Sequence, residues 1–135
     1  MLGEFLVNGI PALILFDSGA TGSYISTKFV KEQSPPTIPK ARPIVTTSPL
    51  GELRCTLECP AVSLMIGGQE FVGDLTVLES DGIDVILGMD WLTEHKGVIS
   101  CSPRTVELTH PSGVKVTVEP QRRRTGQESR TCILR

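Results

Sequence analysis

The sequence is poor in aromatic residues: phenylalanine, tyrosine and tryptophan together make up 4% of its 135 residues. Aliphatic side chains must therefore form most of the hydrophobic core. A chain of this length fits one domain and can bury roughly two-thirds of its unfolded surface. Thirteen glycines and ten prolines predict many turns and few long helices.

Long apolar runs and a strong charge of either sign are also missing. No stretch is apolar enough to span a membrane, and no basic segment precedes an apolar one at the N-terminus, so we expect a soluble, intracellular and cytoplasmic protein. The formal net charge of −2 argues against nucleic-acid or membrane-surface binding by the whole domain. Residues 121–135 hold five arginines and one glutamate, a local charge of 5 − 1 = +4, which leaves nucleic-acid contact open for that segment alone.

The four cysteines follow neither a disulfide framework nor a zinc-binding pattern. Cys55 and Cys59 would point the same way from one strand, too far apart to bridge easily. Zinc sites need closely paired cysteine or histidine ligands, and neither histidine lies in such a pattern. We therefore expect isolated reduced thiols, no metal and no cofactor.

The chain divides into many short strands and one helix. A turn or short helix is expected over residues 27–33, and a helix over residues 89–95 that Gly97 ends. Residues 1–119 are predicted to form the domain and residues 120–135 a basic tail or linker. The strands are predicted at 4–7, 12–16, 23–26, 44–47, 52–59, 62–66, 69–72, 75–78, 85–87, 98–100, 105–108 and 114–118.

The most informative motif is one acid at the end of an apolar run, Leu13-Ile14-Leu15-Phe16-Asp17-Ser18-Gly19-Ala20-Thr21. The apolar run predicts a buried strand, and Ser18-Gly19 predicts a turn that ends it. Burying a carboxylate is costly unless the fold holds it for a purpose. Two such carboxylates could share a proton and activate a water, but the chain has one motif of this kind. Alone, Asp-Ser-Gly is more often a plain β-turn.

A second apolar segment, Val85-Ile86-Leu87, ends at Gly88 and leads into the predicted helix. Glycine at this point lets two backbones approach closely. Asp90 is expected in the first helical turn, where a negative charge is favourable, and not as a second catalytic acid.

The two motifs together resemble the retropepsin group of aspartic proteases, and most closely the protease segment of gypsy-type LTR retrotransposon polyproteins. The resemblance runs from about Glu4 to about Val118. Asp-Ser-Gly-Ala matches the catalytic loop of the group, and Leu-Gly-Met-Asp-Trp-Leu is typical of the retrotransposon branch. The resemblance implies a mostly β, acid-protease-like fold that forms half of a closed-barrel dimer. It also implies one short helix towards the C-terminal side.

The resemblance also implies roles for individual residues. Asp17 would be the catalytic aspartate, Ser18 would lock the two loops across a dimer, and Gly19 would let the loop turn beside the substrate. Ala20 and Thr21 would border the substrate. A substrate-closing flap would fall at Ser48, Pro49, Leu50 and Gly51, and Ile86, Leu87 and Gly88 would support the catalytic loop.

The resemblance thus implies an aspartic endopeptidase that is active as a homodimer on a peptide or polyprotein substrate, most directly its own Gag-Pol polyprotein. Two alternatives stay open. One is a catalytically silent module with the same fold that serves dimerisation or interaction. The other is a cellular retropepsin-like protease domain.

Overall fold

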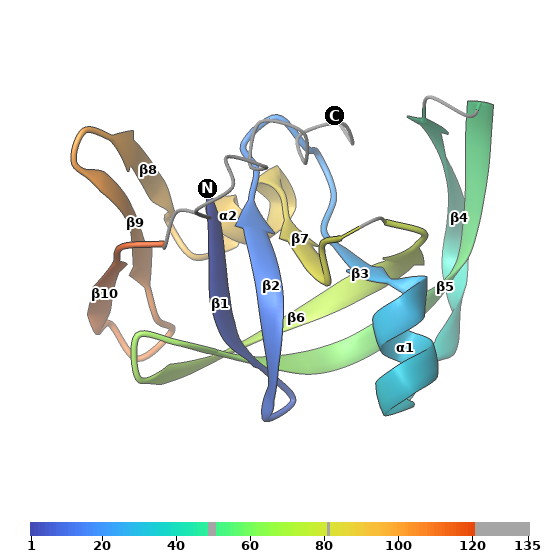
Figure 1. Cartoon of the computed structure of the whole chain (residues 1–135), viewed down its shortest axis with the longest axis horizontal. Coiled ribbons are helices and arrows are strands. Elements are labelled where there is room, and N and C mark those ends of the chain that lie inside the picture. Colours follow the sequence, from blue (N-terminus) through green and yellow to red (C-terminus); the bar gives the residue numbers. More distant parts are fainter. Residues whose placement is uncertain (49–50, 81, 121–135) are drawn as a thin grey trace.

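The computed structural model describes residues 1–48, 51–80 and 82–120, which form ten strands and two helices (Figure 1). Their order is β1 (Leu2–Val7), β2 (Ile10–Phe16), β3 (Tyr24–Ser26), α1 (Thr27–Gln33), β4 (Ile38–Ser48), β5 (Gly51–Ile66), β6 (Gln69–Leu78), β7 (Val85–Leu87), α2 (Met89–Glu94), β8 (Val98–Cys101), β9 (Arg104–Thr109) and β10 (Lys115–Val118).

Six of the strands close into a barrel. They follow the order β1-β2-β7-β3-β6-β5, and β1 pairs again with β5 through Leu6 opposite Met65 and Val7 opposite Leu64. β4 extends the sheet beyond β5. Closure removes most free strand edges and encloses a core of aliphatic residues. The prediction of a mostly β, retropepsin-like fold is confirmed.

Two tight turns set the register of the barrel hairpins. Asn8 and Gly9 join β1 to β2 with φ angles of 49° and 81°, and Gly67 and Gly68 join β5 to β6 with 60° and 80°. Two successive positive φ angles suit the twist of an antiparallel hairpin, and Asn-Gly and Gly-Gly adopt them at low cost. Both hairpins were predicted from the sequence and are confirmed.

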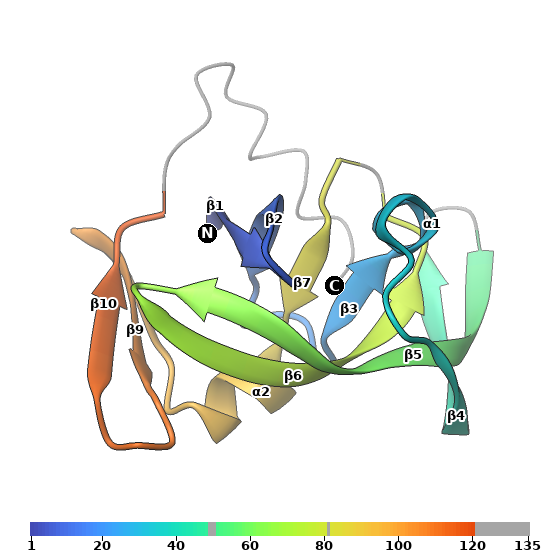
Figure 2. The ribbon, with the colours of Figure 1, turned by 90° about the horizontal axis from the view of Figure 1, so that it is seen from below.

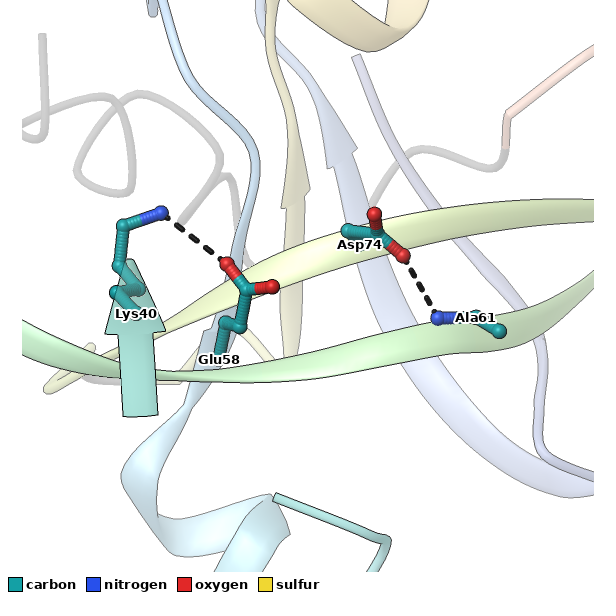
Figure 3. A network of polar contacts seen from close by, with 4 residues as sticks. All are labelled: Lys40, Glu58, Ala61 and Asp74. Carbon is teal, nitrogen blue, oxygen red and sulfur yellow. Dashed lines mark hydrogen bonds and ion pairs between the residues drawn. The ribbon is translucent and has the colours of Figure 1, made fainter. Parts of the chain in front are cut away.

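The middle of the sheet differs from the prediction, because β5 and β6 are each one long strand where the sequence suggested two. β5 passes through an irregularity between Cys59 and Val62, where Ala61 has a φ angle of 51°. The Asp74 carboxylate accepts the Ala61 N–H at 2.8 Å, and Lys40 pairs with Glu58 at 3.3 Å nearby (Figure 3). The bulge bends β5 without ending it, so the strand serves both the barrel and the β4–β5 hairpin.

The helices and the last strands cover the barrel. Residues 27–33 form helix α1, capped by the Ser26 hydroxyl on the Phe29 N–H at 3.0 Å. α2 buries Trp91 and Leu92 and leaves Met89, its first residue, 42% exposed. β8, β9 and β10 form a separate three-stranded sheet, at the opposite end of the molecule from the β4–β5 hairpin (Figures 1 and 2).

The interior is aliphatic, as the composition predicted. Its main cluster combines both sides of the barrel with residues of α2 and the three-stranded sheet, among them Phe16, Ile25, Leu75, Leu92 and Leu108. Within the described residues, no helix is long and apolar enough to cross a membrane. The division at residue 119 stays a prediction, since residues 121–135 lie outside the described part of the chain.

Candidate active site

Asp17 follows the last residue of β2 and is buried, with 3% of its surface exposed. Its N–H donates to the Leu87 carbonyl oxygen at 3.0 Å, and its carbonyl oxygen accepts the Ala20 N–H at 3.1 Å. The Gly19 N–H donates to its Oδ1 at 2.8 Å. The loop therefore fixes the carboxylate through the backbone on both sides and through one of its own oxygens.

The position of Asp17 follows from two neighbouring parallel strands. Phe16 in β2 lies opposite Leu87 in β7, so both strands end at the same edge of the barrel. Ile86 and Leu87 are buried in β7. The loop between β2 and β3 lies on the same side of the molecule as the end of the β4–β5 hairpin (Figure 1).

Gly88 lets the Asp17 loop contact the start of α2. A Cβ atom at Gly88 would lie 2.1 Å from the Gly22 carbonyl oxygen and 2.6 Å from the Ala20 carbonyl oxygen, closer than real contacts allow. In this close packing the Met89 N–H donates to the Ala20 carbonyl at 2.7 Å. The Asp90 N–H donates to the Thr21 carbonyl at 3.2 Å. Loop carbonyls thus satisfy N–H groups at the start of the helix.

Sequence reasoning missed one residue of this junction, Ser23, and the side-chain role of Asp90. The buried Ser23 hydroxyl accepts the Gly88 N–H at 3.0 Å and donates to Asp90 Oδ1 at 2.6 Å. The same oxygen accepts the Trp91 N–H at 2.6 Å. One signal could have indicated this network: a helix that begins after glycine has no side-chain cap of its own and needs an acceptor from elsewhere.

A small apolar cluster lies beside the loop. Tyr24 is 8% exposed within it, and Cys55 of the β4–β5 hairpin packs in the same cluster. Burial raises the pKa of the Tyr24 phenol, and the charges of Cys55 and Asp90 raise it further. Burial also raises the pKa of the Cys55 thiol, with Lys40 opposing the shift. The other members of the cluster are Leu2, Leu15, Ala20, Leu78, Ile83 and Ile86.

The predicted site residues lie on the Asp17 loop, on the end of β7 and at the end of the β4–β5 hairpin. Ala20 is buried at the wall, while Ser18, Gly19 and Thr21 are exposed on the loop. At the predicted flap, Ser48 and Gly51 pair at the end of the β4–β5 hairpin.

The two residues at the predicted flap tip, Pro49 and Leu50, lie outside the described residues. Among the described residues, no group of three or more histidine, cysteine or acidic side chains is arranged to hold a metal ion.

The barrel carries a buried aspartate on a loop that packs closely against Gly88 and the start of α2. This arrangement defines the class as acid-protease-like. The family model for the retroviral aspartyl protease matches residues 1–113, and the chain belongs to this family. A search of curated protein sequences gave no significant match.

Two solved structures have a similar fold. One is the retroviral protease-like domain of Ddi1 from Leishmania major, with a TM-score of 0.60 and 15% identity over 87% of this chain and 89% of that one. The other is EIAV protease complexed with the inhibitor HBY-793, with a TM-score of 0.55 and 21% identity over 70% of this chain and 86% of that one.

Proposed function

We propose that the chain is an aspartic endopeptidase whose active site forms when two copies dimerise. The observation that carries this proposal is the buried Asp17 at the barrel edge, whose backbone N–H donates to the Leu87 carbonyl and whose carboxylate accepts the Gly19 N–H. A carboxylate is seldom buried to this extent unless it serves a function or is paired. Because the chain belongs to the retroviral aspartyl protease family, we assign peptide-bond hydrolysis to the Asp17 carboxylate.

The chemistry requires two carboxylates. When two carboxylates lie a few ångström apart they cannot both ionise, so one keeps a proton. The ionised one takes a proton from the attacking water while the protonated one donates to the oxygen of the scissile carbonyl. Because the chain has one Asp-Ser-Gly loop, a two-fold axis beside Asp17 would supply the second carboxylate.

The substrate would be an extended peptide, bound beside the exposed loop residues and covered by the β4–β5 hairpin. Extended peptides bind sheet edges through their backbone, and a closing hairpin excludes water from the reaction. The Leu-Gly-Met-Asp-Trp-Leu segment favours a retrotransposon Gag-Pol polyprotein as the substrate. Buried free thiols at Cys55 and Cys59 fit the reducing cytoplasm, where we place the protein, associated with particles if it is a retrotransposon product.

A cellular protease is the second candidate. It is favoured by the likeness to the Ddi1 domain, which covers more of this chain than the likeness to EIAV protease does. The two candidates share the mechanism and differ in the substrate.

The test is cleavage of a peptide library between acid and neutral pH by the wild-type chain and by Asp17→Asn. The amide keeps the size of the carboxylate but cannot take a proton from water, so cleavage should fall by at least roughly a thousandfold. Thermal unfolding of both proteins shows whether the variant is folded. Equal cleavage by both would exclude the aspartic mechanism, and no cleavage by a dimeric wild-type chain would favour the silent module.

A further inference from the structure

Tyr24 of β3 lies on the face of the sheet that leads away from the Asp17 loop. Leu15 in β2 lies opposite Ile86 in β7, and Ile86 lies opposite Tyr24. Side chains that lie opposite one another in neighbouring strands share one face of a sheet, and these three belong to the small apolar cluster beside the loop. Because Leu15 precedes Asp17 by two residues, Tyr24 stands two strands away from the strand that leads to the carboxylate, about 10 Å across the sheet.

The hydroxyl of Tyr24 lies over Gly22, in the loop between Asp17 and β3. A Cβ atom at Gly22 would lie 2.9 Å from Tyr24 Oη and 3.2 Å from Tyr24 Cζ, so the absence of a side chain there leaves the phenol its place. Cys55 of the β4–β5 hairpin packs in the same cluster as Tyr24. The phenol therefore belongs to the region between the loop and the hairpin, where the proposed substrate binds.

Within the described part of the chain, this hydroxyl has no hydrogen-bond partner, although Tyr24 is only 8% exposed. It is not one of the unpartnered polar atoms that are completely buried, so it keeps contact with solvent. Buried tyrosines usually find a partner for the hydroxyl. Burial raises the pKa of the phenol, and the charges of Cys55 and Asp90 raise it further, so the group stays a neutral donor. A buried donor without a partner, reached by solvent beside the loop, is available to a ligand.

We propose that the Tyr24 hydroxyl donates a hydrogen bond to an amide carbonyl oxygen of the bound substrate. This inference rests on the proposed function, which places an extended peptide beside the loop and under the hairpin. The backbone carbonyl of a peptide and the side-chain amide of asparagine or glutamine offer the same acceptor. Because two strands separate Tyr24 from the strand that leads to Asp17, the bond forms to a residue near the scissile bond and not to the scissile carbonyl itself. Tyr24 is thus a substrate-binding residue and takes no part in the chemical step.

Tyr24→Phe removes the hydroxyl and keeps the ring, so it tests this bond alone. Loss of one hydrogen bond between uncharged groups should lower kcat/KM roughly three- to tenfold. Because the bond holds the substrate both before and during the reaction, the loss should raise KM and leave kcat nearly unchanged. Wild-type kcat/KM in the variant would overturn the proposal, as would a loss that lies in kcat alone.

The matched control is Thr76→Val. Thr76 lies opposite Tyr24 in β6 and is also buried, so this substitution removes a neighbouring hydroxyl from the same face at similar size. It should leave kcat/KM within about twofold, because it lies one strand further from the Asp17 loop. Equal losses in the two variants would show a general disturbance of the face and would overturn the specific role of Tyr24.

A peptide library identifies the acceptor. If the acceptor is a backbone carbonyl, Tyr24→Phe should slow the cleavage of all peptides by a similar factor. If it is a side-chain amide, the loss should be confined to peptides with asparagine or glutamine at one position. Either pattern supports the donor, and a profile identical to that of the wild type in rate and sequence overturns it.

Gly22→Ala tests the position of the hydroxyl. The added Cβ atom would displace Oη, so this variant should lower kcat/KM by a factor similar to that of Tyr24→Phe. In the Tyr24→Phe background the same substitution should lower kcat/KM by less than about twofold, because no hydroxyl remains to be displaced. Losses that multiply would show that the two substitutions act independently and would overturn the assigned position.

The outcomes also separate this inference from the proposed function. A wild-type chain that cleaves peptides no better than Tyr24→Phe does would overturn the role of Tyr24 and leave the protease standing. A dimeric wild-type chain that cleaves no peptide would overturn both.

Discussion

Replacing Gly88 with alanine is expected to separate the Asp17 loop from the start of α2. The backbone angles at Gly88 are ordinary (φ −95°, ψ −166°), so the effect is steric and not conformational. The added Cβ would lie 2.1 Å and 2.6 Å from two backbone carbonyl oxygens, which cannot rotate away as a flexible side chain could. The loop and the helix must therefore move apart.

The expected loss of stability has two sources, the steric overlap at the new Cβ atom and the weakening of hydrogen bonds between the loop and the helix. Overpacking in a close contact costs about 1–3 kcal/mol. Three hydrogen bonds cross the same contact, from the N–H groups of Gly88, Met89 and Asp90, and each contributes about 0.5–1.5 kcal/mol. With those bonds weakened but not all lost, the free energy of unfolding should fall by about 2–5 kcal/mol. For a domain of this size the Tm would then fall by roughly 6–20 °C.

Urea unfolding and thermal unfolding followed by circular dichroism measure this change. Gly3→Ala is the matched control, because its Cβ would meet the far edge of the Phe5 ring at 2.8 Å, a side chain that can turn aside. We expect Gly3→Ala to cost less than half as much. A Gly88→Ala protein as stable as the wild type would refute the close contact between loop and helix.

Two further predictions concern the same junction. Ser23→Ala removes the acceptor of the Gly88 N–H and a donor to Asp90, so the free energy of unfolding should fall by about 1–3 kcal/mol. Ser63→Ala removes only a solvent-exposed hydrogen bond to Glu70 and should change it by less than about 0.5 kcal/mol, so equal losses would contradict the network. The pKa of Tyr24 is raised above its ordinary 10.0, so its stabilising effect is complete below about pH 10 and is lost as the pH rises towards the raised pKa. Tyr24→Phe should flatten the fall in stability at alkaline pH, and an unchanged fall would contradict this assignment.

The Asp17 loop and the two strands that precede and adjoin it could be predicted because each depends on residues that are close together in the sequence. The apolar run to Phe16, the turn at Ser18-Gly19 and the strand that ends at Gly88 each lie within a few residues, and all three are found where expected. The glycine turn at Asn8-Gly9 likewise sets its hairpin from two residues alone.

The parts that could not be predicted depend on contacts between distant residues. Ser23 and Asp90 are 67 positions apart, so no local pattern joins their side chains. The sequence predicted separate strands at 52–59 and 62–66, but the Asp74 carboxylate accepts the Ala61 N–H between them, and β5 continues through a bulge.

The most direct test of the account is a mixing experiment with the wild-type chain and Asp17→Asn. If each chain of the dimer supplies one of the two catalytic carboxylates, only dimers of two wild-type chains are active. With random exchange of subunits, the share of such dimers equals the square of the wild-type fraction. At a fixed amount of wild-type chain, cleavage should then fall to about half with an equal amount of the variant and to about a tenth with a ninefold excess. Cleavage that stays constant as the variant is added, with exchange of subunits shown independently, would contradict the claim that Asp17 needs its counterpart in a second chain.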